Sequence, residues 1–290
     1  MKIDKVLIAG GTHGNELTGV FLIHHWTKNK TDFSDFSFNT QLLLSNPKAV
    51  ALGRRYVDKD LNRCFFDESI NRPDPTSHED LLAKTIKKDF DSKGGADFII
   101  DMHTSTSNMG ITLMIESNRF NLAIADYVRN RVPGVNIYAF DPSERTQSCL
   151  RSMAPHAIGV EIGPVPQNIY CHKTIKKMQF AVTAVLDGIS AFGCETEKAL
   201  PLNFSDIYTH VKNVSFPDEV VGSKFFIHEE LEKKNYSPIK KGDPLFINIL
   251  GDTIPYAGED NLCPVFVNEA AYYDKNIAFS LVKKEDLLGR

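Results

Sequence analysis

The chain of 290 residues is long enough for one large and one small domain, and its 42% hydrophobic residues can supply a substantial core. A formal net charge of −4 argues against a nucleic-acid-binding surface, and no apolar stretch reaches the roughly 18 residues of a membrane span. The five cysteines are scattered without a CxxC pair, and the N-terminus does not resemble a signal peptide, so we expect reduced thiols in a cytoplasmic protein.

The first 200 residues alternate between strand-like and helix-like patterns. Apolar β-rich runs predict strands at residues 5–10, 41–45, 96–102, 111–115, 135–140 and 157–162. Helical spacing of apolar residues predicts helices at residues 15–28, 77–92, 121–131 and 174–192. Ser77 is the expected N-cap of the second helix. This alternation predicts an α/β domain over residues 1–199, with a sheet flanked by helices.

The pattern changes near residue 200. The following segments are short, β-like and punctuated by Pro and Gly, and they lie at residues 208–215, 225–227, 245–249 and 265–267. We therefore expect a smaller β-rich domain over residues 200–290.

The segment GGTHGNELTGV at residues 10–20 places His13 and Glu16 between the first strand and the first helix. A His and a carboxylate at this spacing can bind one zinc ion together. His103 ends the run ADFIIDMH, and ligand sites of open α/β sheets lie beyond the carboxyl ends of the strands. Two His and one carboxylate are typical of catalytic zinc, which keeps a position for water. Each His alone is more simply an ordinary core or surface residue.

Two further carboxylates lie near the predicted strand ends. Asp101 precedes His103 by two residues on the same strand face, where it could orient the imidazole, although ordinary strand-end hydrogen bonding explains it equally well. Glu161 lies in the apolar run AIGVEIGP, where a carboxylate is costly unless it is paired or functional. Near a metal site it could accept the proton of an attacking water, and the alternative is a structural salt bridge.

The segment RRYVDKDLNR at residues 54–63 carries Arg55, Asn62 and Arg63. Arginine side chains hold carboxylates through two parallel hydrogen bonds, so this segment suggests an anion-binding site. Taken alone, such a run is more simply an exposed charged face. Arg151 is a weaker, isolated signal of the same kind.

Several motifs occur together and in order along nearly the whole chain. They are GGTHGNELTGV, NP at 46–47, RYVDKDLNR at 55–63, DMHTSTSNMG at 101–110, GVEIGPVPQ at 159–167 and CPVFVNEAAYY at 263–273. Each motif alone is modest, but in this order they are specific. By these motifs the chain resembles the aspartoacylase/succinylglutamate desuccinylase group of zinc-carboxypeptidase-like enzymes.

The resemblance implies a carboxypeptidase-like mixed sheet flanked by helices, with the C-terminal β-rich domain capping the active-site mouth. It implies a zinc-dependent amidohydrolase that cleaves N-acyl amino acids, typically N-acetyl-L-aspartate to acetate and aspartate. Many members form homodimers, and we expect one here. Matched by position, His13, Glu16 and His103 correspond to the ligands of one zinc ion per chain. Glu161 corresponds to the general base and Arg55 to the residue that stabilises the developing oxyanion.

The resemblance also assigns the substrate contacts. Asn62 and Arg63 match the pair that holds the α-carboxylate, with Tyr272 nearby, and Arg151 matches the Arg that binds the side-chain carboxylate of aspartate. The chain departs from the pattern at two positions. Thr104 follows His103 where animal aspartoacylases have Asn, and Gln147 stands where a substrate-binding Tyr is expected.

Three other functions are compatible with parts of this pattern. A deacylase for N-acylated aromatic amino acids or mercapturates would share the zinc site, but such relatives lack an Arg at position 151. A catalytically inactive zinc-binding regulatory protein should have lost the base or the oxyanion residue, whereas Glu161 and Arg55 are both present. A peptide-cleaving carboxypeptidase is disfavoured if the C-terminal domain roofs the cleft.

Overall fold

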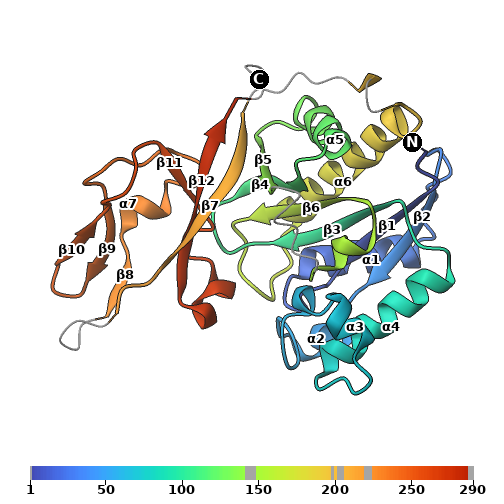
Figure 1. The fold of residues 1–290 in the computed structure, drawn as a ribbon, viewed down its shortest axis with the longest axis horizontal. Helices are drawn as coiled ribbons and strands as arrows, with labels where there is room; N and C mark the ends of the chain where they lie inside the picture. Colours follow the sequence, from blue (N-terminus) through green and yellow to red (C-terminus); the bar gives the residue numbers. More distant parts are fainter. Residues whose placement is uncertain (1, 141–147, 197–198, 201–205, 219–223, 287–290) are drawn as a thin grey trace.

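The structure is a computed structural model that describes every residue except 1, 141–147, 197–198, 201–205, 219–223 and 287–290. The strands of its larger sheet are β1 Lys5–Gly10, β2 Asn39–Leu44, β3 Phe98–Thr104, β4 Gly110–Glu116, β5 Val135–Phe140, β6 His156–Gly163, β7 Ile207–Ser215, β11 Leu262–Val265 and β12 Ile277–Glu285. Within the described residues these nine strands form one mixed sheet, in the spatial order β11-β12-β7-β5-β4-β6-β3-β1-β2 (Figure 1).

A smaller sheet and the helices complete the fold. The strands β8 Phe225–Ile227, β9 Pro244–Asn248 and β10 Thr253–Pro255 form a separate three-stranded sheet, which projects from the body of the molecule (Figure 1). The helices are α1 Leu17–Lys28, α2 Pro47–Leu52, α3 Asp67–Asn71, α4 His78–Ser92, α5 Arg119–Arg129, α6 His172–Phe192 and α7 Glu229–Glu232. Short 3-10 turns are η1 Leu61–Arg63, η3 Leu150–Met153 and η5 Ala270–Lys275.

The strand directions place the ends of β1, β3 and β6 at one edge. β1 is parallel to β2 and β3, and β3 is parallel to β6. β4 runs antiparallel to β6 and parallel to β5, so the sheet is mixed. β7 pairs in parallel with β5 through Tyr138 and Ala139, which joins the C-terminal strands to the same sheet.

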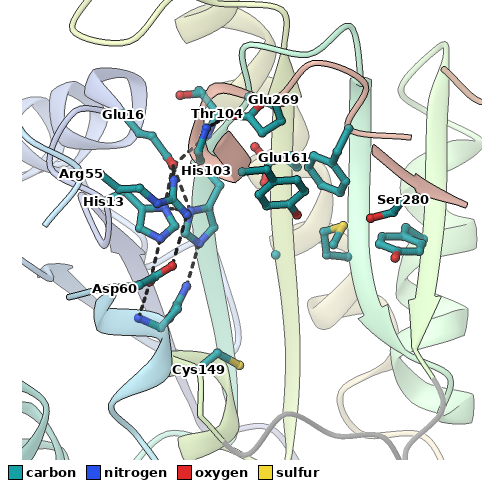
Figure 2. A pocket seen from close by; sticks show the side chains of 18 of the residues that line it. His13, Glu16, Arg55, Asp60, His103, Thr104, Cys149, Glu161, Glu269 and Ser280 are labelled. Atoms are coloured by element: carbon teal, nitrogen blue, oxygen red, sulfur yellow. Dashed lines mark hydrogen bonds and ion pairs between the residues drawn. The ribbon is translucent and has the colours of Figure 1, made fainter. Parts of the chain in front are cut away.

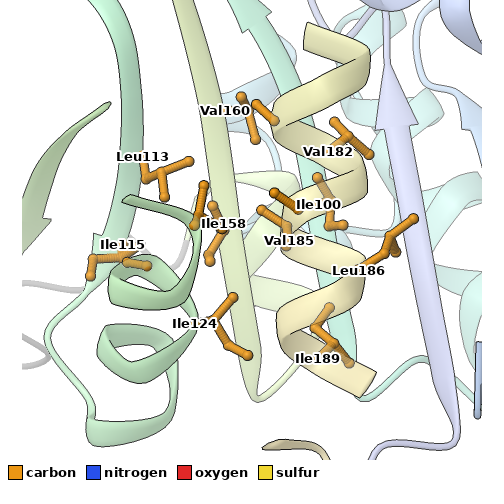
Figure 3. Close-up of a cluster of buried hydrophobic side chains, with 14 of the residues drawn as sticks. Ile100, Leu113, Ile115, Ile124, Ile158, Val160, Val182, Val185, Leu186 and Ile189 are labelled. Carbon is orange, nitrogen blue, oxygen red and sulfur yellow. The ribbon is translucent and has the colours of Figure 1, made fainter. Parts of the chain in front are cut away.

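Both faces of the central strands are buried, and successive side chains enter opposite cores because they point in opposite directions. Val6, Ile8 and Ile100 belong to the larger core, whereas Leu7 and Ile99 belong to a second core on the opposite face. Figure 3 shows the larger core, where side chains of β3, β4 and β6 pack against α5 and α6. Each fully buried Leu, Ile or Val stabilises the fold by about 1.5–3 kcal/mol relative to exposure. α4 covers the opposite face through Ala83 and Ile86.

The predicted fold class is confirmed, and most predicted elements are present. β1, β5 and β8 have the predicted bounds, and Ser77 caps α4 by accepting the backbone N–H of Asp80 at 3.1 Å. The strand predicted at residues 265–267 instead ends at Val265, because Phe266 has a φ of 53°, outside the extended region. β12 was not predicted, although it begins with the largely apolar run IAFSLV before its charged end.

Among the described residues, no helix is both long and apolar enough to cross a membrane. All five cysteines are free thiols.

Candidate active site

The three residues predicted to bind a metal lie together in the structure. His13 and Glu16 come from the loop between β1 and α1, and Glu16 is the N-cap residue of α1. His103 lies near the end of β3, beside that loop. One ligand atom from each residue lies within 4.8 Å of the others, and all three side chains are buried.

Both imidazoles turn the same nitrogen toward Glu16. His13 Nδ1 lies 2.6 Å from Glu16 Oε1, and His103 Nδ1 lies 3.0 Å from Glu16 Oε2. The two Nδ1 atoms are 3.2 Å apart, and Figure 2 shows the three side chains pointing toward one another. Two imidazole nitrogens and one carboxylate are a donor set that suits Zn²⁺. These residues therefore could hold one zinc ion.

The outward-facing nitrogens are held by two further carboxylates. Asp60 Oδ1 lies 3.2 Å from His13 Nε2, and Asp101 Oδ2 lies 2.7 Å from His103 Nε2. Thr12 Oγ1 donates to the other oxygen of Asp101 at 2.8 Å. A carboxylate on the outer nitrogen fixes the tautomer of a metal-binding His and leaves Nδ1 available to the metal. The donor set and its supports thus fit a metal centre.

The charges around Glu16 keep it ionised. Burial alone would raise its pKa, but the charges of His13 and His103 lower it well below the usual range. Burial likewise opposes ionisation of His103, yet Asp101 and Glu16 raise its pKa well above the ordinary value. A bound metal ion would supply the positive charge that a proton on His103 otherwise provides.

Arg55 and Asp60 lie on one side of this cluster (Figure 2). Arg55 Nη1 donates to Glu16 Oε1 at 3.0 Å, and Nη2 reaches Asp60 Oδ2 at 3.5 Å. Burial acts against the charge of Asp60, but His13 and then Arg55 lower its pKa. Sequence reasoning missed Asp60, although it lies in the segment that suggested Arg55.

Glu161 lies on β6 directly opposite His103 of β3 in the strand register. Burial, and then the like charge of Glu16, raise the pKa of Glu161 to about 8. A divalent cation at the neighbouring ligands would oppose this shift, because positive charge favours the carboxylate. Glu161 therefore lies beside the candidate metal centre with a pKa that depends on the charge held there.

These residues line one cavity of about 340 Å³. Its wall also includes the other side chains predicted from the sequence, namely Asn62, Arg63, Arg151 and Tyr272. Asn62 is fixed, because its Oδ1 accepts the N–H of Leu150 at 2.9 Å. Arg151 Nη1 donates to the carbonyl oxygen of Met114 at 2.8 Å. The structure thus brings every predicted site residue to one cavity.

The C-terminal part of the chain contributes to the same cavity. Glu269 is 5% exposed and accepts hydrogen bonds from Ser105 Oγ and from the backbone N–H groups of Thr106 at 2.8 Å and Ser107 at 3.3 Å. Its other oxygen accepts the N–H of Ala271 at 3.0 Å. Glu269 therefore joins the loop after β3 to η5. Glu269 was not among the predicted site residues, although it lies in the motif that contains Tyr272.

Comparison with known proteins agrees with this geometry. Residues 2–189 match the family model of the succinylglutamate desuccinylase/aspartoacylase catalytic domain, and residues 204–284 match the AstE/AspA barrel-sandwich hybrid domain. The chain belongs to the succinylglutamate desuccinylase/aspartoacylase family.

Individual members of the succinylglutamate desuccinylase/aspartoacylase family match over nearly the full length. An N-acyl-aromatic-L-amino acid amidohydrolase (carboxylate-forming) of Xenopus laevis is 36% identical, over 98% of this chain and 95% of that protein. A probable aspartoacylase of Trichodesmium erythraeum is 37% identical over 99% of each. The crystal structure of murine aminoacylase 3 has a TM-score of 0.89 at 30% identity, covering 99% of this chain and 97% of that one.

The structure describes one of the two positions at which the chain departs from the family pattern, Thr104. Thr104 reaches Glu16 through its backbone, since its N–H donates to Glu16 Oε2 at 3.1 Å, so this contact does not depend on the side chain. Gln147 lies outside the described residues.

Proposed function

We propose that this protein is a zinc-dependent amidohydrolase that removes the acyl group from N-acyl-L-amino acids. The observation that carries the proposal is the convergence of His13, Glu16 and His103 beside Glu161 in one cavity. The names of the full-length relatives, an aspartoacylase and an amidohydrolase, support the same reaction class.

Each residue of the site has a separate role in the proposed reaction. When bound, Zn²⁺ supplies a Lewis acid that makes water a better nucleophile near neutral pH. Glu161 accepts the proton of the attacking water and returns it to the departing amine. Arg55 donates hydrogen bonds to the oxygen on which negative charge develops. Asp60 and Asp101 hold the two imidazoles in orientation.

We propose N-acetyl-L-aspartate as the substrate. Asn62 and Arg63 would bind the α-carboxylate, with Tyr272 beside them, and Arg151 would bind the side-chain carboxylate. These side chains come from different segments and line the same cavity. An acidic substrate matches two arginines, whereas a neutral side chain would offer no carboxylate to Arg151.

An N-acyl aromatic amino acid is the second candidate, because the cavity is longer than N-acetylaspartate. Its wall includes Tyr138 and Phe140 of β5, three strand spacings from His103, which corresponds to about 14 Å. In N-acetylaspartate, four bonds separate the acyl carbon from the side-chain carboxylate, a span of about 5 Å. The amidohydrolase from Xenopus laevis is named for aromatic substrates.

We further propose that residues 200–290 act as a domain that caps the mouth of the cavity. Support comes from Glu269, Tyr272 and Lys275, which line the cavity although they lie far from the metal-binding motif in sequence. Glu269 also fastens this part of the chain to the loop after β3.

A side-by-side assay of N-acetyl-L-aspartate and N-acetyl-L-tyrosine tests the substrate. We expect a higher kcat/KM for N-acetyl-L-aspartate. A preference for N-acetyl-L-tyrosine would contradict the aspartate assignment and support the second candidate. If zinc is bound but neither substrate, nor other N-acyl amino acids, is hydrolysed, the protein is an inactive zinc-binding relative.

A further inference from the structure

The segment that carries Arg55 and Asp60 has no regular secondary structure. Residues 53–60 connect α2 to η1 without a helix or strand of their own. A displacement of about 1 Å at a reacting group can cost a hundredfold in rate, so a residue such as Arg55 needs firm support. The support comes from outside the cavity.

A single buried carboxylate holds this segment. Glu79 lies in the first turn of α4 and is 0% exposed. Its Oε1 accepts the N–H of Val57 at 2.7 Å, and its Oε2 accepts the N–H groups of Asp58 at 3.0 Å and Lys59 at 3.2 Å. Three consecutive backbone donors between Arg55 and Asp60 are therefore satisfied by one side chain.

Glu79 also reaches the loop that bears the candidate metal ligands. Asn46 Nδ2 donates to Glu79 Oε1 at 3.1 Å, and the backbone N–H of Asn46 donates to the carbonyl of Gly11 at 3.1 Å. The backbone N–H of Gly14 donates to the carbonyl of Arg55 at 3.0 Å. The two loops are thus tied to each other, and Glu79 lies at the junction.

Side chains of residues 53–60 also bind the first turn of α4, so contacts run in both directions. Asp58 Oδ2 accepts the N–H of His78 at 2.7 Å, and Lys59 Nζ lies 2.6 Å from Asp80 Oδ1. Burial would favour the neutral acid, but the hydrogen bonds from Val57 and Asp58 lower the pKa of Glu79. An ionised carboxylate accepts through both oxygens, so it can receive all four donors at once.

We infer that Glu79 is a positioning residue. By accepting hydrogen bonds from the backbone of residues 57–59, it holds Arg55 in place beside His13, Glu16 and His103. Arg55 contacts Glu16 and Asp60 directly, whereas Glu79 lines no part of the cavity. The inference rests on the proposed role of Arg55 in stabilising developing charge. A merely structural Glu79 would affect folding without acting through Arg55.

The variant Glu79→Gln keeps the shape of the side chain and replaces one acceptor oxygen with an NH₂ group. Whichever oxygen is replaced, two of the four donors lose their partner. We expect kcat to fall about ten- to hundredfold, because Arg55 moves. KM should change less than about threefold, because Asn62 is anchored separately by Leu150.

A double-mutant cycle with Arg55→Ala separates positioning from a structural effect. If Glu79 acts through Arg55, then Glu79→Gln should lower kcat by less than about threefold in the Arg55→Ala background. Equal losses of kcat in both backgrounds, or an unchanged kcat in the single variant, would overturn the inference. An unchanged kcat in Arg55→Ala alone would instead contradict the proposed role of Arg55.

The matched control is Asp126→Asn. Asp126 is also a buried carboxylate, but it lies on α5 and pairs with Arg129 at 2.7 Å, away from the cavity. This control should lower the thermal midpoint and leave kcat unchanged. If Glu79→Gln does not fold, Glu79→Asp replaces it in the same cycle, because this variant keeps the charge but shortens the side chain and withdraws its oxygens from the backbone of residues 57–59. Additive effects of Glu79→Asp and Arg55→Ala would then count against the inference.

Discussion

Two carboxylates in one cavity have opposite environments. The charges of His13 and His103 lower the pKa of Glu16, whereas burial and the neighbouring charge of Glu16 raise that of Glu161 to about 8. Such a division is how a site obtains one carboxylate that stays ionised and another that exchanges a proton. Glu16 therefore suits metal binding, and Glu161 suits proton transfer.

The first prediction concerns Glu161. Glu161→Ala should keep its zinc, because Glu161 is not one of the three candidate ligands, and should lose kcat by about 10²–10⁴-fold, the usual contribution of general acid–base catalysis. Metal analysis and steady-state kinetics measure both quantities. The exposed Glu230→Gln variant serves as the control for handling and purity. Turnover near that of the unmodified protein would remove Glu161 from its proposed role.

The second prediction concerns Arg151. Arg151→Met removes the charge and keeps most of the apolar stem, so it should affect only substrates with a second carboxylate. Losing a hydrogen-bonded charge pair costs about 1.5–3 kcal/mol, which is roughly a ten- to hundredfold loss in kcat/KM for N-acetyl-L-aspartate. Kinetics with N-acetyl-L-alanine are the internal control. Equal losses for both substrates would show that Arg151 does not select the side chain.

At the residue scale, the sequence predicted the groups that follow strands but not those that support them. His13, His103 and Glu161 could be placed because each lies at or beside the end of a predicted strand. Asp60 and Glu269 could not, because each is a single carboxylate in an irregular segment. Their roles come from contacts with residues that are distant along the chain, such as Glu269 with Ser105.

At the scale of elements, η5 and the loop after β3 form one unit. Glu269 precedes η5 and accepts hydrogen bonds from Ser105, Thr106 and Ser107, which directly follow the strand that carries His103. Tyr56 adds a second link, since its hydroxyl donates to Asp274 of η5 at 3.0 Å. Hydrogen bonds of Glu269 and of Tyr56 therefore both hold the C-terminal wall of the cavity in place.

The third prediction concerns this fastening. Glu269→Gln replaces one acceptor oxygen with an NH₂ group, so at least one backbone N–H, such as that of Ala271, loses its acceptor, and the free energy of unfolding should fall by about 1–3 kcal/mol. It should also reduce kcat/KM, because Tyr272 lies on the loosened segment. Thermal unfolding and kinetics measure the two effects, with exposed Glu230→Gln as the matched control. Unchanged values of both would contradict the proposed link between η5 and the cavity.

The sequence predicted best those elements whose apolar residues recur at a regular helical or strand spacing. The helix predicted at residues 77–92 agrees with α4, because Ser77 and the apolar spacing define it together. β12 was not predicted, although its first six residues, IAFSLV, are mostly apolar and five of them are buried. The direction of β4 was also beyond reach, because the order of elements does not distinguish its antiparallel pairing with β6.

At the scale of the whole molecule, the C-terminal part is continuous with the catalytic sheet. β7 pairs with β5, and β12 then pairs with β7, so the sheet extends across both parts of the chain. His210 of β7 and Ser280 of β12 consequently line the same cavity as His103. Figure 2 shows Ser280 on the opposite side of the cavity from His13, Glu16 and His103. The change in composition near residue 200 indicated a second part but not this shared sheet.

The central claim is that hydrolysis depends on a metal held by His13, Glu16 and His103. The most direct test measures N-acyl amino acid hydrolysis before chelation, after removal of the metal, and after zinc is added back. We expect activity to disappear with the metal and to return in proportion to bound zinc, up to one ion per chain. Hydrolysis that continues at the same rate in the metal-free protein would contradict the account.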